Sequence, residues 1–133
     1  MTVKVFLVED LAKTAGLMKE LFASLGYSVM GSVATEAEAL QWLDEHDKDW
    51  DLAVVDLVLE QGTGFGVIRR CRDASAQGKT VVFSSFVSPA VREHLLELGA
   101  DAVIDKSDST ALVAYCAAFA ESLQGRAEVQ PPA

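Results

Sequence analysis

The sequence predicts an α/β domain in which helices cover both faces of a doubly wound parallel sheet. Five short apolar runs of strand length alternate with longer segments whose apolar residues recur every three or four positions. The short runs are rich in Val, Leu and Ile, which is typical of parallel strands buried on both faces. With 133 residues, half of them apolar, the chain is long enough for one such domain with a substantial core.

The five predicted strands are apolar runs that are too short to be helices. β-branched and aromatic residues are frequent in them, as strands favour. Their sequences are VKVFLV at 3–8, YSVMGSV at 27–33, LAVVDL at 52–57, TVVFS at 80–84 and AVI at 102–104.

The five predicted helices follow the strands, where apolar residues repeat with helical spacing. They cover residues 11–25, 37–43, 65–71, 91–98 and 112–123. The expected N-terminal caps are Thr35, Ser88 before Pro89, and Ser107 or Asp108. The glycines expected in a left-handed conformation after helices are Gly26, Gly78 and Gly99.

A strand–helix unit repeated five times implies right-handed crossovers between parallel strands. We therefore predict a flavodoxin-like (βα)5 fold whose five-stranded sheet has the order 2-1-3-4-5, in a domain that covers residues 1–123. Residues 124–133 include Gly125, Pro131 and Pro132, so they are expected to form a flexible C-terminal tail that does not pack.

The charge of the chain excludes some partners. Acidic residues outnumber basic ones by 20 to 11, which gives a formal net charge of −9. A surface of this sign repels phosphate backbones and anionic lipid headgroups. We therefore expect no direct binding to nucleic acid and none to membranes.

The N-terminus and the cysteines indicate a cytoplasmic protein. The opening MTVKVFLVED reaches two acids after one short apolar run, so it does not resemble a signal peptide. No later run approaches the ~20 apolar residues of a membrane helix. Cys71 and Cys116 lack metal-binding spacing and fall at apolar helical positions, which favours reduced thiols in the core.

The residues that follow the strands are the candidates for chemistry, because open parallel sheets bind ligands at the carboxyl ends of their strands. These residues are Glu9 and Asp10 after the first strand, Asp56 at the third, Ser84 and Ser85 at the fourth, and Asp105 and Lys106 after the fifth. Three acids, a hydroxyl group and a lysine can therefore meet at one edge of the sheet.

Glu9, Asp10 and Asp56 are expected to lie close together, since the first and third strands are neighbours in the predicted order. Carboxylates at close range either raise each other's pKa or recruit a cation. An all-oxygen set suits Mg²⁺, or the similar Mn²⁺, better than zinc. Such a metal would let a phosphoryl group approach the Asp56 carboxylate, while Lys106 and Ser84 hold its other oxygens, so the expected product is an aspartyl phosphate.

Four motifs occur in order, each at the end of a predicted strand: VFLVED, VVDLVLEQGTG, TVVFSS and AVIDK. In this order and within one domain length, they resemble the receiver domains of bacterial two-component response regulators. The resemblance extends from the N-terminus to about residue 123. It assigns roles residue by residue: phosphoacceptor to Asp56, metal-side acids to Glu9 and Asp10, a metal-binding backbone carbonyl to Val58, switch hydroxyl to Ser84 and phosphate-contacting lysine to Lys106.

The resemblance also implies the partners. A sensor histidine kinase or a phosphotransfer protein would supply the phosphoryl group, and a downstream protein target would bind in response. Only a short segment follows the last helix, so the chain is expected to act as a stand-alone receiver. It would catalyse only its own phosphorylation and dephosphorylation, and is therefore not an enzyme in the ordinary sense. By analogy, the partner face would combine the fourth helix, fifth strand and fifth helix, including Arg92, Leu96 and Val103.

The chain departs from the family pattern at two positions. Ser107 follows the lysine where many receivers have proline, and Val103 replaces an aromatic residue associated with the family's switch.

Two further positions bear on the lifetime of the phosphate. The resemblance implies that Val58, two residues after Asp56, and Phe86, two after Ser84, flank the phosphoryl group, and neither side chain can orient an attacking water. We therefore expect a long-lived aspartyl phosphate.

Several alternatives remain open from the sequence. Asp10 can be a helix cap, and Ser85 competes with Ser84 for the hydroxyl role. A metal-dependent phosphohydrolase acting through an aspartyl phosphate would usually need an acid at the position of Val58. A flavodoxin-like cofactor binder would need a glycine- and hydroxyl-rich loop where this chain has EDLAK. A pseudo-receiver that binds partners without phosphorylation is a further alternative.

Overall fold

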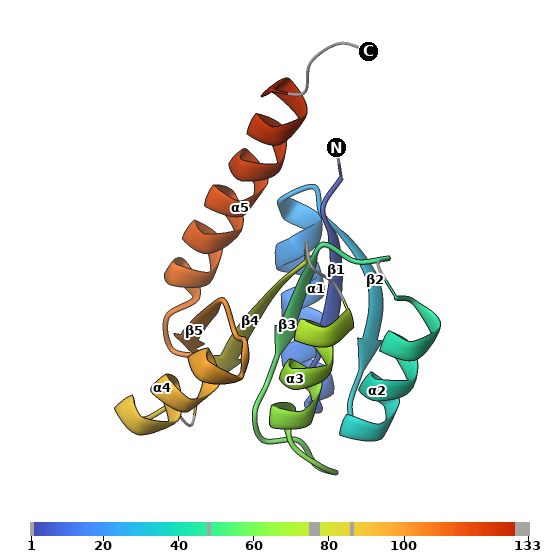
Figure 1. Ribbon diagram of the computed structural model, residues 1–133, viewed down its shortest axis with the longest axis vertical. Helices are drawn as coiled ribbons and strands as arrows, with labels where there is room; N and C mark the ends of the chain where they lie inside the picture. The colour runs from blue at the N-terminus through green and yellow to red at the C-terminus, as the bar shows by residue number, and fades with distance from the viewer. Residues whose placement is uncertain (1, 48, 75–77, 86, 130–133) are drawn as a thin grey trace.

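The computed structural model describes residues 2–47, 49–74, 78–85 and 87–129, and strands and helices alternate along it (Figure 1). The strands are β1 (Lys4–Val8), β2 (Ser28–Val33), β3 (Leu52–Val55), β4 (Lys79–Ser84) and β5 (Ala102–Asp105). The helices are α1 (Ala12–Ser24), α2 (Glu36–Glu45), α3 (Gly64–Ala74), α4 (Pro89–Leu98) and α5 (Ser109–Val129).

The sheet has the predicted topology. Its order is β2-β1-β3-β4-β5, and all four pairings are parallel. This arrangement confirms the flavodoxin-like (βα)5 fold. It also makes β1 and β3 neighbours, with Val8 opposite Val55, so the residues that follow these two strands emerge side by side.

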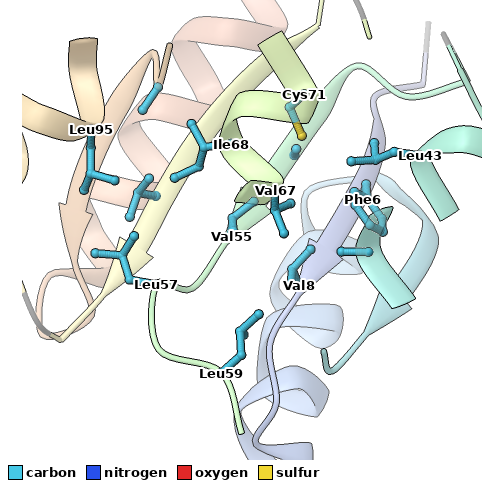
Figure 2. Packing of buried hydrophobic residues seen from close by; sticks show 14 of the residues in the cluster. Phe6, Val8, Leu43, Val55, Leu57, Leu59, Val67, Ile68, Cys71 and Leu95 are labelled. Carbon is cyan, nitrogen blue, oxygen red and sulfur yellow. The ribbon is translucent and has the colours of Figure 1, made fainter. Parts of the chain in front are cut away.

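The strands β1, β3 and β4 are buried on both faces because successive side chains enter two separate cores, whereas β2 at the edge of the sheet is only partly buried. On one face, Phe6 and Val8 of β1 pack with residues of α2, α3 and α4 (Figure 2). On the other face, Val5 and Leu7 pack with residues of α1 and α5. Figure 1 shows α1 and α3 on opposite sides of the sheet. Burial on both faces explains why the sequences of β1, β3 and β4 are largely apolar.

The helix caps agree with the sequence at most positions. The side chains of Thr35 and Ser88 accept hydrogen bonds from Glu38 N and Val91 N, and Asp108 rather than Ser107 accepts the bond from Ala111 N. Gly26 and Gly99 have positive φ, as predicted.

The prediction for Gly78 is wrong, because its φ is not in the left-handed region. A Cβ at this position would collide with the ring of Trp50, so close packing requires the glycine there.

The predicted end of the last helix is also wrong. The sequence places it near Leu123, whereas α5 continues to Val129. A single glycine such as Gly125 costs a helix only about 1 kcal/mol relative to Ala, and the alanine, arginine and glutamate around it are good helix formers. The flexibility of residues 124–133 stays a prediction, and 130–133 lie outside the described residues.

Both cysteines are buried and free, as predicted. Burial raises the pKa of the Cys71 thiol to about 12 and that of the Cys116 thiol to about 11, so both remain protonated thiols at neutral pH. No helix in the described part of the chain is both long and apolar enough to span a membrane.

Candidate functional site

Three carboxylates converge at the carboxyl edge of the sheet. Glu9 and Asp10 follow β1, and Asp56 follows β3. The backbone continues the sheet pattern at this edge, because Asp56 N donates to Val8 O at 3.0 Å and Glu9 N donates to Val33 O at 3.0 Å. One oxygen from each of the three side chains lies within 4.8 Å of the others. The structure therefore brings together the acids that the sequence placed at this edge.

Lys106 reaches the same cluster from the end of β5. Its Nζ donates to Glu9 Oε1 at 2.5 Å and to Asp56 Oδ2 at 2.8 Å. Its backbone N donates to Ser84 O at 3.1 Å, so the end of β4 fixes the backbone position of Lys106. The ammonium group thus contacts carboxylates from two other strands at once.

Burial controls the electrostatics of this cluster. The Glu9 side chain is 1% exposed and that of Asp56 is 8% exposed. Burial raises the pKa of the Glu9 carboxyl, although the hydrogen bond from Lys106 acts in the opposite direction. Burial alone would lower the pKa of Lys106, but its hydrogen bonds to Asp56 and Glu9 outweigh this effect and raise it. Lys106 is therefore a cation at neutral pH.

The acid cluster fits a hard divalent cation. Glu9 Oε2 is buried without a hydrogen-bond partner among the described residues, so it has a free acceptor position beside two further carboxylates. When all three acids and Lys106 are ionised, the cluster carries an excess of two negative charges. Oxygen ligands and this charge are what Mg²⁺ requires. Asp10 does not act as a helix cap, because Leu11 holds the N-cap position of α1 and no side chain caps it.

The hydroxyl candidates differ in burial. Ser84 is the last residue of β4 and is fully buried, whereas Ser85 is exposed. In the register, Ser84 lies opposite Asp105, next to the residue that carries the ammonium group. Ser84 therefore remains the better candidate for the switch hydroxyl.

Comparison with known proteins identifies the family. The model of the response regulator receiver domain matches residues 5–117. The chain belongs to the response regulator receiver family. This assignment covers most of the chain and includes every residue of the cluster described above.

Solved structures of receivers share the fold. A signal receiver domain assigned to a Luxo repressor protein of Vibrio parahaemolyticus has a TM-score of 0.82 at 20% identity, over 99% of this chain and 100% of that one. The CheX-CheY-BeF3-Mg²⁺ complex of Borrelia burgdorferi gives 0.79 at 18% identity, over 88% and 89%. A Burkholderia pseudomallei response regulator with a phosphorylated aspartic acid gives 0.76 at 21% identity, over 97% and 75%. No curated protein sequence matches the chain.

Some general properties are shared by the members of the receiver family. Receiver domains interact with kinases and downstream effectors, and phosphorylation and Mg²⁺ binding are typical of the family. They are generally not true enzymes.

The loop that follows Asp56 in this receiver is closely packed. Gly64 N donates to Leu57 O at 2.8 Å, and a Cβ on Gly64 would collide with the backbone carbonyl of Asp56. Gly62 has a φ of 87°, a left-handed conformation that favours glycine. Both glycines of the Gly-Thr-Gly turn are thus required by the backbone.

Sequence reasoning missed one residue at this loop. Glu36, the first residue of α2, accepts a hydrogen bond from Thr63 N through Oε1 at 3.0 Å. A glutamate in the first turn of a helix is usually explained by the helix dipole, so its type and position gave no signal of a contact with a distant loop.

One residue of the proposed partner face does not belong to it. Val103 is 2% exposed, because β5 directs its side chain into the core beneath α4. Its carbonyl accepts a hydrogen bond from Arg92 Nη1 at 2.8 Å. The prediction that Val103 contacts a partner is therefore wrong, whereas Leu96 is 46% exposed and remains available.

We predict that Gly64→Ala destabilises the receiver and slows its labelling by a phosphodonor, since the added methyl group displaces the Asp56 backbone. Overpacking of this kind typically costs about 1–3 kcal/mol. Gly16→Ala in α1 is the matched control, because a Cβ there meets nothing and alanine favours a helix by up to about 1 kcal/mol. Urea denaturation and a labelling time course check both. Equal stability of Gly64→Ala and the wild type would contradict the packing argument.

Proposed function

We propose that this receiver accepts a phosphoryl group on Asp56 in the presence of Mg²⁺ or Mn²⁺, and that it signals by binding a downstream protein in its phosphorylated form. The donor would be a histidine kinase or a phosphotransfer protein. The observation that carries the proposal is the contact of the Lys106 ammonium with both Asp56 and Glu9 inside a buried acid cluster. Such an arrangement holds a nucleophile, a cation site and a phosphate-binding cation within one small volume.

Each residue of the cluster has a role in this reaction. Glu9, Asp10, Asp56 and the backbone carbonyl of Val58 would hold the metal, and a bound metal would neutralise charge on the incoming phosphoryl group. An Asp56 oxygen attacks phosphorus, and the bond from phosphorus to the donor breaks with its electron pair leaving on the donor.

Lys106 then changes partners. Its ammonium donates to the carboxylates of Glu9 and Asp56 before transfer, and to a phosphoryl oxygen afterwards. Ser84 supplies a hydroxyl donor to another phosphoryl oxygen. Because the two residues are joined through Lys106 N and Ser84 O, a shift at one of them displaces the other. This coupling is a route from the chemistry to the surface over β4 and β5.

Two solved neighbours support the proposal. One contains a phosphorylated aspartic acid, and the other is a complex with BeF3 and Mg²⁺. A phosphohydrolase is less well supported, because position 58 carries an exposed valine, which offers no general acid or base.

The decisive experiment is intact-mass measurement of the purified chain after incubation with acetyl phosphate and Mg²⁺. We expect the mass of one phosphoryl group to be added, with peptide mapping to Asp56. Samples with EDTA should remain unmodified. A chain that stays unmodified with Mg²⁺ and with Mn²⁺ would be a pseudo-receiver, and the proposal would fail.

We further predict that Val58→Asn shortens the lifetime of the phosphoryl group. Val58 is 51% exposed, so the substitution costs little stability and places an amide where it can orient an attacking water. A tenfold faster decay corresponds to a barrier lower by about 1.36 kcal/mol. Phe86, the second apolar residue predicted to flank the phosphate, lies outside the described residues.

Decay of the isolated phosphoprotein, followed by mass after donor removal, measures the effect. Leu17→Asn is the control, since it makes the same kind of change at an exposed position in α1. An unchanged or slower decay in Val58→Asn would refute the water-positioning argument.

A further inference from the structure

Glu36 joins α2 to the loop that follows the acceptor residue. Its side chain accepts the hydrogen bond from Thr63 N at 3.0 Å, and its backbone N donates to Gln61 O at 3.1 Å. The loop lies directly against it, because a Cβ on Gly62 would collide with the Glu36 side chain. Two hydrogen bonds and this close packing therefore fix the far side of the loop to the first residue of a helix.

The near side of the same loop belongs to the proposed phosphorylation site. Thr63, whose N–H donates to Glu36, forms an antiparallel bridge with Val58, the residue whose carbonyl is proposed to bind the metal. The next residue, Gly64, packs against the backbone of Asp56. A continuous series of backbone contacts thus runs from the Glu36 carboxylate through Thr63 to Val58.

Charge also favours this contact. Helix α3 has no acidic residue in its own first turn, although N–H groups at a helix N-terminus favour a nearby anion. The other Glu36 oxygen, Oε2, lies against Gly66 in that turn, where a Cβ would collide with it. The Glu36 carboxylate of α2 therefore contacts both the loop and the N-terminus of α3.

We propose that Glu36 is a positioning residue of this receiver, which sets the place of the Val58 carbonyl and thereby the affinity for Mg²⁺ and the rate of phosphorylation. It contacts neither the metal nor the phosphoryl group. The inference rests on the proposed function, since it assigns to Glu36 the support of that same site. Residues that orient metal ligands from outside typically change metal affinity about 10-fold to 100-fold when they are removed.

The test compares Glu36→Ala and Glu36→Gln with Glu38→Ala in the full chain. Glu38 lies in the same turn of α2, but among the described residues its carboxylate accepts hydrogen bonds only from the start of its own helix, at Ala34 N and Thr35 Oγ1. Glu38→Ala therefore weakens the capping of α2 and leaves the loop contact intact. Any effect shared by the Glu36 and Glu38 variants comes from the stability of α2.

Two readouts are needed besides the melting temperature. Mg²⁺ titration followed by NMR gives the Kd, and the labelling rate by acetyl phosphate is measured as a function of Mg²⁺ concentration. We expect Glu36→Ala to weaken Mg²⁺ binding about 10-fold and to slow labelling at limiting Mg²⁺, with partial recovery at saturation. Glu36→Gln should retain most of the affinity, because its amide oxygen still accepts from Thr63 N. Glu38→Ala should match the wild type in Kd.

The outcomes separate the two proposals. A wild-type chain that takes up phosphoryl groups while Glu36→Ala keeps its Mg²⁺ affinity and its rate overturns the inference alone. Equal losses in Glu36→Ala and Glu38→Ala also overturn it, since they show a general effect of α2. A wild-type chain that neither binds Mg²⁺ nor becomes labelled overturns the proposed function and this inference with it.

Discussion

Asp56→Asn is expected to abolish labelling by acetyl phosphate while the fold persists. The substitution removes the carboxylate that is proposed to attack phosphorus and keeps the shape of the side chain, so the surrounding packing is preserved. An amide at this position still accepts a hydrogen bond from Lys106, and it removes one charge from a buried cluster with a negative excess. The effect on phosphorylation is thus far larger than the effect on stability.

The measurement is intact mass after saturating incubation, with circular dichroism to verify folding. Asp73→Asn is the matched control, because its carboxylate lies on the surface of α3, and it should be labelled to the wild-type extent. Labelling of Asp56→Asn at the wild-type stoichiometry would contradict the assignment of the acceptor.

Loss of Mg²⁺ binding in Asp10→Ala is the second large effect that we expect. The three carboxylates lie close enough to share one ion, and Asp10 is the most accessible of them. Few protein oxygens and several waters should complete the shell, so the wild-type affinity should be weak and the loss of one carboxylate should nearly eliminate it.

Trp fluorescence or NMR titration with Mg²⁺ measures this binding. Asp105→Ala provides the control, since Asp105 ends β5 at the same edge of the sheet. Its Oδ1 accepts hydrogen bonds from the N–H and the hydroxyl group of Ser107, so it does not join the cluster. A Kd of Asp10→Ala equal to that of the wild type would exclude Asp10 from the metal site.

The sequence predicted the convergence of Glu9, Asp56 and Lys106 because parallel strands all deliver their carboxyl ends to one edge. Strand order then decides which residues become neighbours, and the almost continuous apolar strands indicated a sheet buried on both faces. The position of these three residues therefore depends on the topology, which apolar patterns and helix caps reveal well.

Other features depend on contacts that no local pattern reveals. The contact of Glu36 with Thr63 joins residues that are far apart in the sequence, and it depends on the exact path of the loop. Gly78 is explained by the ring of Trp50, not by its own conformation. The burial of Val103 follows from the position of α4, and the extra turns of α5 follow from helix formers that outweigh one glycine.

The two ion pairs of Lys106 also bear on how the domain folds. In many small metal proteins, the ligands repel one another until the ion arrives, so folding must wait for metal supply. In this chain the Lys106 ammonium, which follows β5, forms ion pairs with the carboxylates of Glu9 and Asp56, which follow β1 and β3. The chain itself therefore supplies a positive charge to the acid cluster. We therefore expect the domain to fold in the absence of Mg²⁺, because Lys106 already offsets part of the carboxylate charge.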